Sequence, residues 1–168
     1  MTARSRVIAA AAVGCALVLA PLVMRPGPRL VYNATSSAPV GFYWHGTRPP
    51  RVGDLALVRP PPPLARWMAS RHYLPLNVPL IKRIAAVEGQ AVCIQSGVVT
   101  IDGVDVGIAL RRDLLGRRLT PSVLCRRLGP DEIFLLNSAP RSLDGRYFGP
   151  LSRRCVLGRV TPLWTWGR

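Results

Sequence analysis

Lys82 is the only lysine among the 23 lysine and arginine residues of this chain. Arginine stays charged at any accessible pH, whereas a lysine that is buried among apolar neighbours can lose its proton near neutrality. Lys82 lies in the apolar stretch 80–87, whose isoleucine and valine residues predict a mostly buried β-strand. Burial there would lower the pKa of its ammonium from about 10.4. Lys82 is therefore a candidate general base, and the alternative is a residue left by chance in an arginine-rich composition.

A base of this kind needs a hydroxyl group to activate. Residues 33–43 are small, hydroxyl-bearing and punctuated by proline and glycine, which predicts a fixed turn rather than a helix. Ser37 in this turn is the candidate nucleophile, and the alternative is an ordinary polar loop. Histidine is the usual partner of such a serine, but His45 and His72 form no convincing serine-histidine-aspartate constellation. We therefore favour a serine-lysine pair, in which the hydroxyl of Ser142 would hold the lysine amine.

Four segments follow one another in the order of the motifs of a known protease family. They are Asn33-x-Thr35-x-Ser37-x-Pro39-x-Gly41-x-Tyr43, Gly53-Asp54-x-x-x-Val58, Lys82-Arg83-(x)5-Gly89 and Ser142-x-Asp144-x-Arg146-Tyr147-Phe148-Gly149. These segments resemble the boxes of the type I signal peptidase family of membrane-anchored serine-lysine proteases. The nearest resemblance is to its conjugative-transfer branch, the TraF-type pilin-processing peptidases. One residue separates Ser37 from Pro39, where housekeeping signal peptidases have two.

The resemblance implies a role for each residue of the predicted chemistry. Ser37 would be the nucleophile and Lys82 the general base. Thr35, two residues before the nucleophile, would donate a hydrogen bond to the oxyanion together with the backbone N–H of Ser37. Ser142 would orient the lysine amine. No metal and no other cofactor is expected.

The same resemblance implies that Asp144 and Arg146 form a structural ion pair that holds the last box against the site. Without the resemblance, they would be interpreted as a solvated surface pair worth under about 1 kcal/mol. The chain departs from the family pattern at three positions. Gln90 stands where the lysine box usually has aspartate, and Asn137 lies near a position that is commonly aspartate. Gly145 stands where the last box often has serine. We expect these departures to concern loop packing more than chemistry.

The first element that would position these residues is an apolar segment at residues 7–24, which has arginines on both sides and is just long enough to span a bilayer. The alternative is a cleavable signal peptide, but Pro21 follows the plausible cleavage site and would block it. We expect an uncleaved, single-pass anchor in a bacterial inner membrane. Residues 1–6 would be a cytoplasmic tail, and residues 28–168 would be one periplasmic catalytic domain.

The remainder predicts a mainly β, signal-peptidase-like domain. Residues 64–73 predict a short amphipathic helix within an apolar insertion, 62–78, that packs on the core or contacts lipid or a partner. Residues 111–127 are rich in arginine and predicted to be irregular. The predicted strands are 30–32, 80–87, 133–137 and 156–160, with a turn leading into a strand over 51–58 and a hairpin or meander over 92–106.

The formal net charge of +15 raises the question of nucleic acid. The arginines are scattered and no nucleic-acid-binding motif accompanies them, so we expect attraction to an anionic lipid surface and no nucleic-acid partner. The cysteines lack metal-site spacing. In a domain outside the cytoplasm one disulfide is permitted among Cys93, Cys125 and Cys155. The pairing stays open, with a preference for Cys93 and Cys125 because both lie in the same β region.

The predicted activity is that of a membrane-anchored serine endopeptidase acting through an ester on Ser37. By resemblance, its substrate is a pilin or other secreted precursor of a conjugative transfer system, and type IV secretion components are its expected partners. Some members of this branch also join the acyl-enzyme to the N-terminus of the pilin, and the sequence does not separate hydrolysis from this cyclisation. The alternatives are a general signal peptidase and a non-catalytic, membrane-anchored scaffold. A self-cleaving repressor-type protease ranks last.

Overall fold

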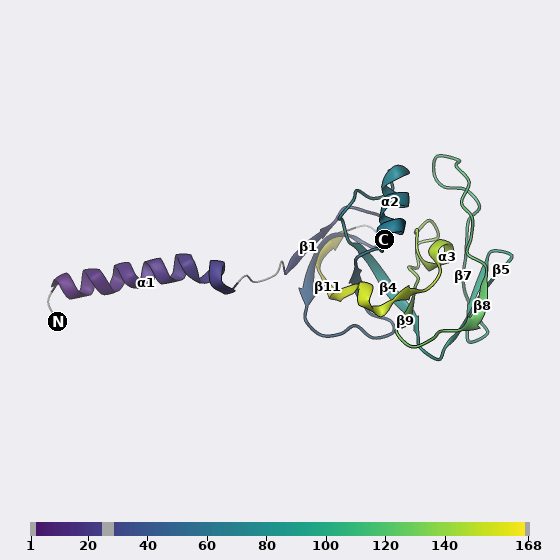
Figure 1. The fold of residues 1–168 in the computed structure, drawn as a ribbon. Helices are drawn as coiled ribbons and strands as arrows, with labels where there is room; N and C mark the ends of the chain where they lie inside the picture. Colours follow the sequence, from purple (N-terminus) through teal and green to yellow (C-terminus); the bar gives the residue numbers. More distant parts are fainter. Residues whose placement is uncertain (1–2, 25–28, 167–168) are drawn as a thin grey trace.

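The chain begins with one long apolar helix, α1 (Ala3–Met24), in the computed structural model, which describes residues 3–24 and 29–166 (Figure 1). A helix of 22 residues is about 33 Å long, close to the thickness of the hydrocarbon core of a bilayer. Its window Ala3–Ala20 is apolar enough to cross a membrane and is 0% buried. The predicted N-terminal apolar helix is confirmed. It begins earlier than expected, because residues 3–6 are already helical.

The larger of two antiparallel sheets carries the four sequence boxes. Its strand order is β1-β2-β11-β3-β4-β9-β10. The boxes therefore lie on strands of this sheet, or on the segments that connect them, although they are far apart in sequence. The fold is mainly β, as predicted. The strands are β1 (Leu30–Asn33), β2 (Val40–Gly46), β3 (Leu55–Val58), β4 (Leu80–Val87), β9 (Glu132–Leu135), β10 (Leu151–Ser152) and β11 (Val156–Trp166).

The smaller sheet has four strands in the order β7-β6-β5-β8 and lies at the side of the domain away from β1 and β2 (Figure 1). Cys93 in β5 lies opposite Cys125 in β8, and the two form a disulfide. The preferred pairing is therefore confirmed, and Cys155 is left as a free thiol. The strands are β5 (Ala91–Gln95), β6 (Val98–Ile101), β7 (Val104–Ile108) and β8 (Leu124–Arg127).

Strand β4 connects the three buried apolar clusters of the domain. It pairs with β3 on one side and with β9 on the other, and it contributes Leu80 and Ile84 to the first cluster, Ala86 to the second and Ile81 to the third. A strand buried in this way is a fixed part of the core rather than a movable edge. Lys82, in the middle of these residues, is held on an interior strand of the sheet.

The inserted segment after β3 contains α2 (Pro62–Ser70), which starts with prolines in its first turn, where a missing N–H costs nothing. Met68 is buried in the first apolar cluster, and Trp67 and Tyr73 pack against that cluster. Core packing therefore accounts for the apolar residues of this helix. Two shorter helical segments follow, α3 (Gly145–Phe148) and a 3₁₀ turn at Arg153–Cys155.

Several local predictions are wrong in their boundaries. The predicted turn 33–43 ends early, because β2 begins at Val40 and pairs with both β1 and β11. β8 lies inside the segment predicted to be irregular, since pairing with β5 outweighs its charge. α3 lies in the predicted loop after Ser142. β11 continues to Trp166 instead of ending at residue 160.

Candidate active site

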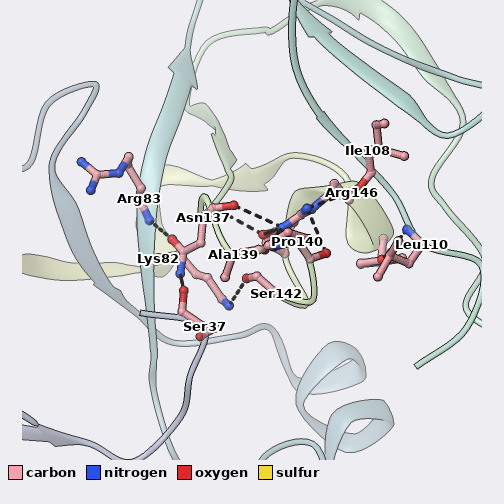
Figure 2. A network of polar contacts seen from close by, with 12 residues as sticks. Ser37, Lys82, Arg83, Ile108, Leu110, Asn137, Ala139, Pro140, Ser142 and Arg146 are labelled. Carbon is pink, nitrogen blue, oxygen red and sulfur yellow. Dashed lines mark hydrogen bonds and ion pairs between the residues drawn. The ribbon is translucent and has the colours of Figure 1, made fainter. Parts of the chain in front are cut away.

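Lys82 is the buried cation of the candidate site. Its side chain is only 2% exposed, and its Nζ donates a hydrogen bond to Ser142 Oγ at 2.8 Å (Figure 2). Burial lowers the pKa of Lys82 from 10.5 to about 8; the carboxylate of Asp144 opposes this shift and the guanidinium of Arg146 adds to it. A neutral amine is therefore available near physiological pH, which proton abstraction from a hydroxyl requires.

Ser37 lies in the turn between β1 and β2, and the buried side chain of Asn33 fixes this turn. Asn33 Nδ2 donates to the carbonyl oxygens of Thr35, Ala38 and Pro39, at 2.9, 3.1 and 3.0 Å. The Thr35 hydroxyl donates to Asn33 Oδ1 at 2.9 Å and lies 3.3 Å from Ser37 Oγ. One asparagine side chain thus hydrogen-bonds polar groups of three residues of the turn and holds its shape without regular secondary structure.

The structure brings Thr35, Ser37, Lys82 and Ser142 to the wall of one cavity of about 710 Å³, which we call the cleft. Among the described residues, no hydrogen bond joins Lys82 Nζ to Ser37 Oγ, and the amine is turned to Ser142. Catalytic hydrogen bonds are often long or absent in an enzyme without its substrate. The arrangement can supply a hydroxyl, a neutral amine and donors for an oxyanion on one surface.

Asp144 and Arg146 form a fully buried ion pair, 0% and 2% exposed. Both oxygens of Asp144 accept from the guanidinium at 2.8 Å, and Asp144 also caps α3 by accepting from the backbone N–H of Arg146. The remaining guanidinium protons are satisfied, as a buried ion pair requires. They bind the carbonyl oxygens of Ile108, Asn137, Ala139 and Pro140 (Figure 2). The surface alternative for this pair is wrong, and the pair fixes the loop that carries Ser142.

Asn137 is a site residue whose importance the sequence did not reveal. It follows β9 and is 5% exposed. Its Oδ1 accepts from the backbone N–H of Arg83 at 2.7 Å, and its Nδ2 donates to the carbonyl oxygen of Ser37 at 2.6 Å (Figure 2). Its own backbone N–H donates to Asp144. Asn137 therefore joins the serine turn, the lysine strand and the loop of the ion pair, and its place just before the last box was the available signal.

The fold and the site together define a mainly β domain that follows an apolar helix and places a serine turn beside a buried lysine. The chain matches the family described as "Signal peptidase, peptidase S26" over residues 3–166, and it belongs to that family. The resemblance inferred from the four boxes is thus confirmed.

The relatives include several transfer proteins. Plasmid transfer protein TraF of Escherichia coli is 29% identical over 164 residues, which cover 91% of this chain and 92% of the relative. Conjugal transfer protein TraF of Agrobacterium fabrum is 35% identical over 147 residues, with 79% and 81% covered. Probable conjugal transfer protein TraF of Sinorhizobium fredii is 37% identical over 149 residues, with 80% and 76% covered. A crystal structure of a signal peptidase I from Enterococcus faecalis superposes with a TM-score of 0.42 at 20% identity, covering 69% of this chain and all of that one.

Proposed function

We propose that this protein is a membrane-anchored serine endopeptidase that cleaves a pilin or other secreted precursor of a conjugative transfer system. The observation that carries the proposal is the buried amine of Lys82, which is held by Ser142 in the same cleft as Ser37. A lysine at such a position costs stability, because its charged form is desolvated. A structural role would be met at lower cost by an apolar side chain, so the position favours chemistry.

In the proposed reaction, neutral Lys82 Nζ accepts the proton of Ser37 Oγ as this oxygen bonds to the carbonyl carbon of the scissile peptide bond. The negative charge that develops on the carbonyl oxygen is stabilised by the backbone N–H of Ser37 and by Thr35, whose hydroxyl turns from Asn33 toward the oxyanion. The Lys82 ammonium then returns its proton to the leaving amine, and an ester on Ser37 remains. Water or another amine, deprotonated by Lys82, attacks the ester carbonyl carbon; the bond to Ser37 Oγ breaks, and the Lys82 ammonium returns the proton to Ser37 Oγ.

The proposed substrate class rests on the relatives, which are named plasmid or conjugal transfer proteins. The proposed location of the domain outside the cytoplasm has separate support. α1 is long enough to anchor it, and a Cys93–Cys125 disulfide is stable in an oxidising compartment such as the periplasm.

The test is the intact mass of a pilin precursor from the same transfer system, co-expressed with the wild-type protein or with Lys82→Arg. The variant keeps the positive charge and removes the base, since arginine is not deprotonated in proteins. We expect a shortened pilin with the wild type and the full precursor with Lys82→Arg. A product lighter by one further water identifies aminolysis by the N-terminus of the pilin instead of hydrolysis.

Equal processing by both proteins would exclude the serine-lysine mechanism. Processing of many unrelated secreted precursors would favour a general signal peptidase. If deletion of the gene abolishes transfer and the Lys82→Arg variant restores transfer in full, the scaffold alternative would be favoured.

A further inference from the structure

A second cavity lies beside the cleft. Its volume is about 740 Å³, and it is lined by the end of the α2 insertion, the loop 110–119 and the loop of the last box. Tyr73, Arg141 and Leu143 line both this cavity and the cleft. A chain that occupies the cleft therefore reaches the second cavity within a few residues, since an extended peptide advances about 3.3 Å per residue.

The second cavity is strongly basic, and we call it the basic cavity. Five arginines line it, together with a single acidic residue, Asp113. The carboxylate of Asp113 is already engaged, because it accepts from Tyr73 Oη at 2.5 Å and from Arg117 Nε at 2.6 Å. Among the described residues, the other four arginines of the basic cavity have no acidic partner; they are Arg71, Arg111, Arg112 and Arg141.

The loop 110–119, which carries Arg111, Arg112 and Arg117, is held in a defined shape. The two Asp113 oxygens accept four hydrogen bonds, two of them from the backbone N–H groups of Leu115 and Arg117. The Arg117 guanidinium lies 4.9 Å above the Tyr73 ring and donates to the Arg71 carbonyl oxygen. These contacts tie the loop to the end of the α2 insertion. The basic cavity is thus organised before any ligand arrives, which lowers the entropy cost of binding.

Two of the arginines have free guanidinium groups. In residues 3–24 and 29–166, the side chains of Arg111 and Arg141 make no hydrogen bond, whereas those of Arg71 and Arg112 donate to carbonyl oxygens of the same region. Guanidinium forks match the geometry of a carboxylate. Leucine side chains between the arginines offer an apolar wall, so the basic cavity suits a carboxylate on a peptide better than a small, fully hydrated anion.

We infer that the basic cavity binds a carboxylate of the peptide substrate within a few residues of the bond presented to Ser37, from an acidic side chain or from a nearby C-terminus. This inference rests on the proposed function, because it takes the cleft to hold a peptide. The lining shared with the cleft favours a peptide over the phosphate of an anionic lipid. The basic cavity then selects the substrate and fixes its register.

The test measures binding, so that it does not depend on cleavage. The full chain with Ser37→Ala, purified in a neutral detergent, is titrated into short alanine- and threonine-rich peptides that carry an uncharged dye. One glutamate is moved along the peptide, each peptide has a glutamine counterpart, and all have an amidated C-terminus. A further glutamine set keeps the free C-terminus. We expect one position, or the free C-terminus, to bind about fivefold more tightly than its neutral counterpart.

Matched variants assign that preference to the basic cavity. Arg111→Gln should reduce the fivefold ratio to about one, whereas Arg111→Lys should retain part of it. Arg66→Gln is the control. Arg66 is an exposed residue of α2 that lines neither cavity, so the substitution removes the same charge at a position outside both. It should leave the ratio unchanged.

Equal binding of the charged and neutral peptides at every position, including no binding of either, would overturn the inference. A preference that Arg111→Gln and Arg66→Gln reduce equally would also overturn it, since the effect would then come from net charge. The titration is repeated in phosphatidylcholine nanodiscs with and without phosphatidylglycerol. Loss of the preference with the anionic lipid would mean that a lipid phosphate occupies the basic cavity. Precursor processing by the wild type tests the proposed function separately.

Discussion

At the scale of single residues, the proposed mechanism depends on keeping one amine neutral. A lysine in water is protonated at neutral pH, and the shift of the Lys82 pKa to about 8 comes first from burial. Only the neutral fraction can act as a base, and below pH 8 this fraction falls about tenfold for each pH unit. We expect log kcat/KM for precursor cleavage to rise with a slope near one from pH 6 and to level off above about pH 8. A rate that is constant between pH 6 and 8 would contradict Lys82 as the base.

The same burial predicts a pH-dependent stability, whether or not the protein is a protease. The folded-state pKa of Lys82 is lowered, so between about pH 8 and 10.5 the folded chain binds fewer protons at this group than the unfolded chain. Wild-type stability therefore gains from this group as the pH rises through that window. Lys82→Met removes the effect and should be more stable than the wild type at pH 6 by roughly 3 kcal/mol at most. Thermal unfolding at pH 6 and pH 10 checks this, because the difference should shrink at the higher pH.

Sequence reasoning named the candidate reactive groups, and it named Asn33 and Asn137 without the contacts by which their amides hold the candidate site together. Serine, lysine and threonine have side chains that can take part in catalysis, and their positions in the boxes indicated which of them to consider. Asn33 and Asn137 act through backbone carbonyl oxygens of other segments, and those partners are known only once the strands are paired. The place of such a side chain in or beside a box can mark it, but its backbone partners in distant segments cannot be identified from the local sequence.

Asn137→Asp tests this supporting role. The change keeps the acceptor for the backbone N–H of Arg83 but replaces the donor to the Ser37 carbonyl oxygen by a second acceptor. An unsatisfied, partly buried carbonyl that faces a carboxylate should lower the free energy of unfolding by about 1–3 kcal/mol and displace the serine turn. We expect precursor cleavage to fall at least about tenfold. Asn77→Asp, at an exposed loop position, is the control and should change neither quantity.

At the scale of elements, β4 shows where a sequence pattern predicts a strand correctly. β8 shows where it fails, because this strand lies in the arginine-rich segment that was predicted to be irregular. β4 was predicted with its observed bounds because most of its residues are apolar and five of its eight residues are buried. β8 reads as a charged segment, and its strand conformation depends on pairing with β5 and on the Cys93–Cys125 bond. β2 was missed because its residues follow a proline-containing turn. Long-range pairing, which no local window contains, decides both cases.

The approach of α3 to β9 explains the glycine at position 145. A Cβ atom there would lie 2.6 Å from the ring of Phe134 and 2.7 Å from the carbonyl oxygen of Leu135. Phe134 is fully buried, so the ring has no free space to move into. Gly145→Ala should therefore lower the free energy of unfolding by about 1–3 kcal/mol. Gly107→Ala is the matched control, because its nearest contact would be at 3.9 Å, and a chemical unfolding titration that finds both variants equally stable would refute this packing.

At the scale of the whole molecule, the helix and the disulfide support the proposed location of the domain on the outer side of a membrane. α1 is long and apolar enough to cross a membrane, and a disulfide such as Cys93–Cys125 persists most readily in an oxidising compartment. With alkaline phosphatase fused after Arg168, we expect high phosphatase activity, because that enzyme folds only where its own disulfides form. We also expect the fusion to remain in the membrane fraction at the mass of the uncleaved chain, since Pro21 blocks removal of the helix.

The control variant carries Val13→Arg and Leu17→Arg. Each arginine near the centre of a span costs about 2.5–3.5 kcal/mol of insertion free energy, so the pair should leave the fusion in the cytoplasm with low phosphatase activity. Low activity of the unaltered fusion would place the domain in the cytoplasm, where the Cys93–Cys125 bond and access to a secreted precursor would both be lost. A soluble, shortened product would instead show that α1 is a signal sequence. The location of the Ser37 cleft relative to its substrate thus depends on α1, which contributes no residue to that cleft.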